Sequence, residues 1–120
     1  MNKNIYMIKL GKGKKKILYC GAFHANEWIT SMLLVEFIRE YCNRINEKNN
    51  IYNDTCVYII PMLNPDGVDL VNNKIEKENK YYLNAKKISD KYKNIVFPYG
   101  WKANINGVKL KNFQPNYKSL

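Results

Sequence analysis

A near-continuous apolar run at residues 55–62 (TCVYIIPM) constrains the fold of this chain more than any other segment. Eight residues without a charge are typical of a strand that is buried on both faces, and such strands occur in parallel sheets. A second strand-like segment, residues 16–20 (KILYC), precedes it and is separated from it by an amphipathic stretch. The order strand, helix, strand predicts a right-handed βαβ crossover in which the two strands run parallel.

The amphipathic stretch has the period of a helix. Apolar residues recur largely at three- and four-residue spacing from about residue 26 to residue 46, beginning with Trp28 and ending with Ile45. The remaining positions of this period, on the expected polar side, carry charged residues: Glu36, Arg39, Glu40 and Arg44. A second, short helix is expected around residues 80–91.

A further strand is predicted at residues 5–10 (IYMIKL), which are rich in β-branched and aromatic side chains. The glycine-containing segment GKGKK lies between it and residues 16–20, and we expect it to close a β-hairpin. The predicted fold class is therefore α/β. It consists of a mixed sheet with an N-terminal β-hairpin and a βαβ crossover, with helices packed on the sheet, in one domain spanning residues 1–120.

The composition excludes several classes of protein. With 46% hydrophobic and 13% aromatic residues, the chain is globular rather than disordered. No run approaches the roughly 20 apolar residues that a membrane span needs. Lysines and glycines interrupt any apolar core of a signal peptide near the N-terminus, so a cytoplasmic location is expected for the sequence as written.

The formal net charge of +10 raises the question of a nucleic-acid partner. The basic residues are 18 lysines and two arginines, and they are scattered among Asn, Ile and Tyr. The one dense cluster, residues 12–16, falls in a glycine-containing turn where lysines are commonly just solvated. We therefore expect no nucleic-acid partner. A basic nucleic-acid-binding domain is an alternative that would require a clustered positive face.

One histidine is present in the chain, and it lies at the end of a predicted strand. His24 follows residues 16–20 closely, and Glu27 stands three residues later. An imidazole nitrogen and a carboxylate both bind zinc, and these two can turn toward one point above the sheet. A second interpretation is structural: the helix dipole favours an acidic residue in the first turn, and His24 is then an ordinary loop residue.

The second parallel strand ends in the turn signal NPDG, residues 64–67. Asn64 and Asp66 are expected to shape this loop. Because the carboxyl ends of parallel strands lie at one edge of the sheet, the loop should converge with His24. In open α/β sheets, that edge is where ligands bind.

Three segments in this order resemble the zinc carboxypeptidase family: HANEWIT at residues 24–30, NPDG at residues 64–67 and GWKANINGVKL at residues 100–110. The likeness extends over residues 5–117 and is closest to the bacterial branch that cleaves γ-D-glutamyl–diaminopimelate bonds in cell-wall peptides. The resemblance implies that His24 and Glu27 are zinc ligands. It also implies that Lys102 lies near the scissile carbonyl, where a cation stabilises the developing oxyanion.

The resemblance also implies groups that these 120 residues lack: a second histidine ligand, a tyrosine near the substrate and the glutamate general base. Lys109 replaces the aspartate that braces the zinc-ligand histidine in the family. The clamp for the substrate carboxylate falls on Lys111 and Asn112 if the alignment has no gap. With a one-residue deletion, Lys111, Asn112 and Phe113 instead match the family's Arg-Asn-Phe, and both alignments stay open.

We therefore interpret the sequence as an N-terminal piece of a zinc-dependent metallocarboxypeptidase, with Zn²⁺ as cofactor and a peptide or cell-wall peptide as substrate. Because the second histidine and the base are absent, little or no peptidase activity is expected of the isolated chain. An exposed sheet edge is expected, with a companion fragment or self-association as its consequence. The alternative is a non-catalytic relic or binding module that keeps the fold.

Overall fold

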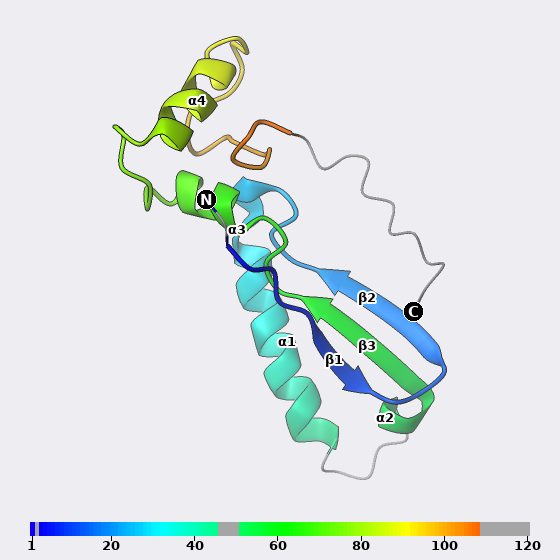
Figure 1. Cartoon of the computed structure of the whole chain (residues 1–120). Coiled ribbons are helices and arrows are strands. Elements are labelled where there is room, and N and C mark those ends of the chain that lie inside the picture. Colours follow the sequence, from blue (N-terminus) through cyan, green and yellow to red (C-terminus); the bar gives the residue numbers. More distant parts are fainter. Residues whose placement is uncertain (2, 46–50, 109–120) are drawn as a thin grey trace.

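The structure, a computed structural model, describes residue 1, residues 3–45 and residues 51–108. Three strands form one mixed sheet: β1 (Ile8–Gly11), β2 (Lys15–Cys20) and β3 (Thr55–Ile60). Their order is β1-β3-β2, with β3 parallel to β2 and antiparallel to β1 (Figure 1). The mixed α/β class and the parallel pairing of β2 with β3 are confirmed.

The predicted β-hairpin is wrong, because β3 lies between β1 and β2. The lysine-glycine segment instead arches over the start of β3. Gly13 N donates to Thr55 O at 3.1 Å, and a Cβ on Gly13 would lie 2.0 Å from the backbone carbon of Asp54. The apolar strand takes the central position, where both faces are covered. The lysine-bearing strand β2 stands at the edge, where its charged side chains reach water.

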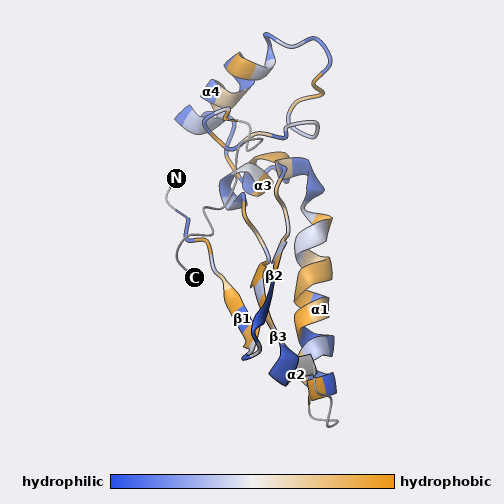
Figure 2. Ribbon diagram, turned by 90° about the vertical axis from the view of Figure 1, so that its right-hand side faces the viewer, coloured by the Kyte–Doolittle hydropathy of each residue, from blue (hydrophilic) through white to orange (hydrophobic). Residues whose placement is uncertain are grey.

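The predicted crossover helix is confirmed. A short 3₁₀ helix, η1 (Ala25–Glu27), leads into α1 (Ile29–Ile45), and α2 (Ile51–Asp54) precedes β3. Helix α1 covers one face of the sheet (Figures 1 and 2). Tyr19 of β2 meets Phe37 of α1 edge to face, with ring centroids 5.5 Å apart. The charged residues predicted for the polar side of α1 are exposed.

The segment after β3 differs from its prediction as a simple turn. Residues 64–67 form the start of α3 (Pro65–Val71). Asn64 caps this helix, since its side chain accepts a hydrogen bond from Gly67 N, and Pro65 occupies the first helical position, where its missing N–H costs nothing. The second predicted helix is confirmed as α4 (Lys80–Ser89). Among the described helices, none is long and apolar enough to cross a membrane.

A compact apolar cluster, the upper core, forms beyond the carboxyl end of the sheet, between η1, α3, α4 and the segment around residue 101. Tyr82, Phe97 and Trp101 stack edge to face through it, with centroids 5.2 and 6.0 Å apart. Its buried members are Ala25, Leu70, Val71, Ile75, Tyr82, Ala85, Trp101, Ala103 and Ile105. Trp101 is 2% exposed, which fits the packing role expected for it, whereas Trp28 is 40% exposed and is not packed in this core.

Candidate metal centre

The path from β2 to His24 is fixed by backbone contacts with the segment that follows β3. Gly21 N donates to Ile60 O, and Gly21 O accepts from Leu63 N, both at 2.9 Å. A Cβ on Gly21 would stand 2.5 Å from Pro61 O, so this close approach requires glycine. The ends of the two parallel strands therefore remain tied together beyond the sheet itself.

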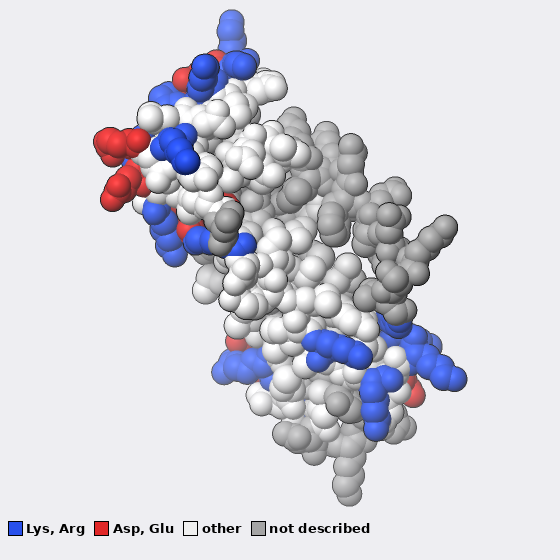
Figure 3. Space-filling view, viewed as in Figure 1, with Lys and Arg blue, Asp and Glu red and all other residues white. Residues whose placement is uncertain are grey.

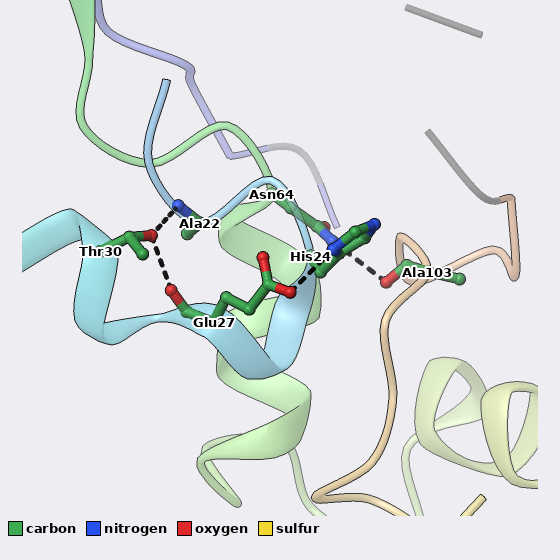
Figure 4. A network of polar contacts seen from close by, with 6 residues as sticks. All are labelled: Ala22, His24, Glu27, Thr30, Asn64 and Ala103. Carbon is green, nitrogen blue, oxygen red and sulfur yellow. Dashed lines mark hydrogen bonds and ion pairs between the residues drawn. The ribbon is translucent and has the colours of Figure 1, made fainter. Parts of the chain in front are cut away.

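Ala22 turns the chain from β2 toward η1 in a backbone conformation that alanine rarely adopts. Its φ is +46° and it is fully buried. The amide of Ala22 donates to Thr30 Oγ1, and the same hydroxyl donates to Glu27 O, each at 2.7 Å (Figure 4). Thr30 thus holds the strained turn and the first turn of the helix to each other.

The structure brings His24 and Glu27 together as predicted from their spacing. His24 Nδ1 lies 2.9 Å from Glu27 Oε1, and the two side chains point toward one another (Figure 4). His24 occupies the cap position of η1, yet its side chain makes no capping hydrogen bond. The Glu27 carboxylate contacts His24. The pair therefore does more than begin a helix, and this favours the metal-ligand interpretation over the structural one.

The geometry of the pair fits two positions of a zinc site. Zinc–nitrogen and zinc–oxygen bonds are about 2.0–2.2 Å long, so two donors of one tetrahedral ion stand about 3.4 Å apart. The observed 2.9 Å between Nδ1 and Oε1 needs only a small side-chain rotation to reach that separation. The two side chains are 33% and 46% exposed, so an ion can enter from solvent. Within the described part of the chain, no group of three or more His, Cys, Asp or Glu side chains could hold a metal.

Asn64 joins the two other segments of the resemblance to this site. It is 3% exposed, and its Nδ2 donates to Ala103 O at 3.0 Å while its Oδ1 accepts from Gly67 N at 3.2 Å. Next to this contact, Ala25 N donates to Lys102 O at 3.4 Å. The predicted convergence of residues 24–30, 64–67 and 100–103 is therefore present.

The side chain of Lys102 is exposed and is held to the site only through its own backbone. Lys102 also forms part of the wall of a shallow cavity with Tyr92 and Ile95, which His24 and Glu27 do not line. The role of Lys102 as an oxyanion stabiliser stays a prediction. Lys109, Lys111 and Asn112 lie outside the described residues, so the predictions on them also stand as made.

Two contributors to the site were missed in the sequence. Thr30 could have been suspected because it stands one helical turn after Glu27, where a hydroxyl reaches the carbonyl three residues earlier. Asn64 precedes a proline at a helix start, a recognised capping pattern. Its second contact, with Ala103, spans 39 residues and has no local signal.

Asp66, in the first turn of α3, is the described carboxylate whose protonation the fold shifts clearly. Its Oδ1 is buried and makes no hydrogen bond within the described chain. Burial raises the pKa of the Asp66 carboxyl above its ordinary value, and Asp69 adds to the rise, while the N-terminal amine and Lys3 oppose it. Asp66 lies outside the His24–Glu27 pair, which fits the loop-shaping role expected for it.

Charged side chains gather at two ends of the molecule on the face seen in Figure 3, over α4 and over the far end of the sheet. Acidic residues stand among the basic ones near α4, and the middle of this face is largely uncharged. The charges on this face thus form separate groups rather than one basic stripe.

Comparison with known proteins shows the family. Residues 1–119 match the sequence profile of the zinc carboxypeptidases, and the chain belongs to that family. It is 39% identical over 116 residues to gamma-D-glutamyl-L-diamino acid endopeptidase 1 of Lysinibacillus sphaericus, a match covering 90% of this chain and 28% of the relative. Identity to the uncharacterized protein YqgT of Bacillus subtilis (strain 168) is 32%, over 97% of this chain and 33% of that protein.

A fungal relative, metallocarboxypeptidase A of Arthroderma otae, is 30% identical over 76% of this chain and 24% of its own length. The chain thus spans a third or less of these curated relatives. No solved structure matches it significantly.

Proposed function

We propose that this chain supplies part of a zinc-dependent centre that hydrolyses peptide bonds, with His24 and Glu27 as two metal ligands. The 2.9 Å approach of Nδ1 and Oε1, at the carboxyl end of two parallel strands, is the observation that carries the proposal. When bound in such a centre, zinc polarises a carbonyl and makes water a better nucleophile. The membership of the chain in the zinc carboxypeptidase family supports the same assignment.

The chain's own residues hold and orient the centre. His24 offers the Nδ1 lone pair when its proton is on Nε2, and Glu27 adds a negative charge beside it. Thr30 and Ala22 fix the turn that carries both ligands. Lys102 is anchored by its backbone next to this turn, and its long exposed side chain can place a positive charge where a carbonyl oxygen becomes negative.

The substrate class that we propose is a cell-wall peptide with a γ-D-glutamyl–diamino acid bond. The support is the 39% identity to an endopeptidase whose name specifies this bond. A glutamyl residue linked through its γ-carboxyl keeps a free α-carboxylate, so such peptides are acidic. A net charge of +10 favours encounter with an acidic substrate.

We further propose that the 120 residues by themselves have little or no peptidase activity. A catalytic zinc needs three protein ligands and an open position, and the sequence contains one histidine only. Two ligands seldom hold zinc tightly. Lys109 adds a cation where the family has a bracing aspartate, a substitution that favours the alternative of a non-catalytic binding module.

The test is to load the purified chain with Zn²⁺ and assay it on L-Ala-γ-D-Glu-diaminopimelate and on a peptide with a free C-terminus. Weak zinc binding without turnover is expected, and His24→Ala should abolish the binding. Turnover that disappears in His24→Ala would contradict the proposed inactivity. Zinc-independent binding of the tripeptide, unchanged in His24→Ala, would instead support the binding module.

A further inference from the structure

The outer face of α1 changes character halfway along the helix. In and just before its first two turns it exposes large apolar side chains, each 40–68% accessible: Trp28, Ile29, Met32, Leu33 and Val35. The continuation of the same face carries Glu36, Arg39 and Glu40, with Glu36 and Arg39 forming an ion pair. Figure 2 shows α1 alone on its side of the sheet, with no further described element against its outer face.

This contrast separates a surface made for contact from one made for water. A helix that is solvated along its whole length carries charged residues throughout its outer face. Here only the second half does, while the first half presents a contiguous apolar patch of the kind that marks an interaction site. Trp28, the first residue of the patch, directly follows Glu27, so the patch adjoins the two metal ligands.

The edge of β2 beside α1 shows the same mixture. Strand β2 pairs with β3 on one side, and among the described residues no strand pairs with its other side. Its first residues are lysines, while Ile17 and Tyr19 are apolar and about two-fifths exposed, at 38% and 42%. Tyr19 contacts Phe37 of α1, so these residues lie on the same layer boundary as the helix. An open strand edge beside apolar residues can accept another strand.

We infer that a polypeptide segment outside these 120 residues docks on this surface and brings the third zinc ligand to His24 and Glu27. The docking surface consists of Ile17, Tyr19, Trp28, Ile29, Met32, Leu33 and Val35. The inference rests on the proposed function for the ligand, while the docking itself rests on the exposed apolar face alone.

Two observations select this occupant over a second copy of the chain. First, the relatives are about three times longer than the matched segment, so polypeptide that accompanies this segment exists in each of them. Second, a second copy carries the same net charge of +10, and pairing of two β2 edges would bring lysines toward lysines.

The experiment mixes this chain with the part of the Lysinibacillus sphaericus relative that lies outside the matched segment, produced as a separate polypeptide. Sedimentation velocity should show an equimolar complex. Leu33→Lys should weaken it by about tenfold or more, because it places a charge in the contact. The matched control Glu40→Lys, on the charged half of the same face, should change the affinity by less than about twofold. Both sites are exposed, so both variants should keep the circular dichroism of the parent.

Absence of a complex, or a complex that tolerates Leu33→Lys as well as Glu40→Lys, would overturn the inference. Self-association of the chain alone that is lost in Leu33→Lys would also overturn it, since the occupant would be a second copy. Tight zinc in the complex, lost in His24→Ala while the complex persists, is the result expected for the third ligand. A complex that binds no zinc would overturn the proposed metal centre but leave the docking surface established.

Discussion

The two ends of this molecule bury their apolar residues to very different degrees. The upper core closes on itself: Leu70 and Ala85 are fully buried, and Trp101 is 2% exposed. Helix α1, by contrast, buries only Ser31 completely and exposes large apolar residues. The difference shows that one end is self-sufficient while the other presents a contact surface. His24 and Glu27 lie at the boundary, next to Ala25 of the upper core, where a docking segment can reach a rigidly held pair.

The two tryptophans offer the strongest way to break this comparison. Trp101→Ala should destabilise the chain by about 3–5 kcal/mol, because it empties the centre of the upper core. Trp28→Ala should cost less than about 1 kcal/mol in the isolated chain, since the side chain is 40% exposed. Urea unfolding followed by circular dichroism measures both. Equal losses would show that the α1 face is as important to the isolated fold as the upper core.

Gly13→Ala tests the far end of the sheet. The new Cβ would lie 2.0–2.2 Å from backbone atoms of Asp54 and Thr55, so the arch must move away from β3. A loss of about 1–3 kcal/mol is expected from such overpacking. Lys12→Ala and Lys14→Ala, which alter exposed neighbours in the same arch, should stay within about 0.5 kcal/mol of the parent in thermal unfolding. A neutral Gly13→Ala would mean that the arch does not rest on the central strand.

Two helix caps sharpen the contrast between the joint of the site and the periphery. Asn64→Ala should cost about 1–3 kcal/mol, because it leaves Ala103 O and Gly67 N without their partner in a buried place. Asn79→Ala removes only the cap of Tyr81 N at the start of α4 and should cost about 1 kcal/mol. If the two losses proved equal in chemical denaturation, Asn64 would be a cap and nothing more.

The smallest expected effect concerns Asp66. Its raised folded pKa means that the native state retains the proton longer than the unfolded state does. The contribution of Asp66 to stability is therefore largest at acidic pH and is lost as the pH rises from its ordinary carboxyl range through the raised value. Asp66→Asn should remove this part of the slope when unfolding free energies are compared across that window. An identical slope in both proteins would contradict the assigned burial effect.

The sequence predicts the framework of this fold well where one segment dominates. The apolar strand β3 and the period of α1 allow the crossover, and with it the meeting of His24, Glu27 and residues 64–67, to be inferred. The hairpin was wrong because the GKGKK signal is local, whereas strand pairing depends on β3, whose apolar residues claim the centre of the sheet from some 40 residues away. Helix α3 was missed because Asn-Pro-Asp-Gly begins a turn and a helix equally well.

The finer geometry of the site had no such signal. The positive φ of Ala22 and the bond from Asn64 to Ala103 depend on contacts that only the assembled fold creates. The exposure of α1 was likewise hidden, since an apolar period predicts burial but does not name the partner that provides it.

The most direct test of the account uses the fact that His24 is the only histidine, so its imidazole nitrogens form a single pair of ¹⁵N resonances. Zn²⁺ should perturb Nδ1, which faces Glu27, more strongly than Nε2, and Glu27→Gln should weaken the zinc dependence of that shift. A dominant shift of Nε2, no shift at all, or a response unchanged by Glu27→Gln would contradict the assignment of His24 and Glu27 as two ligands of one metal.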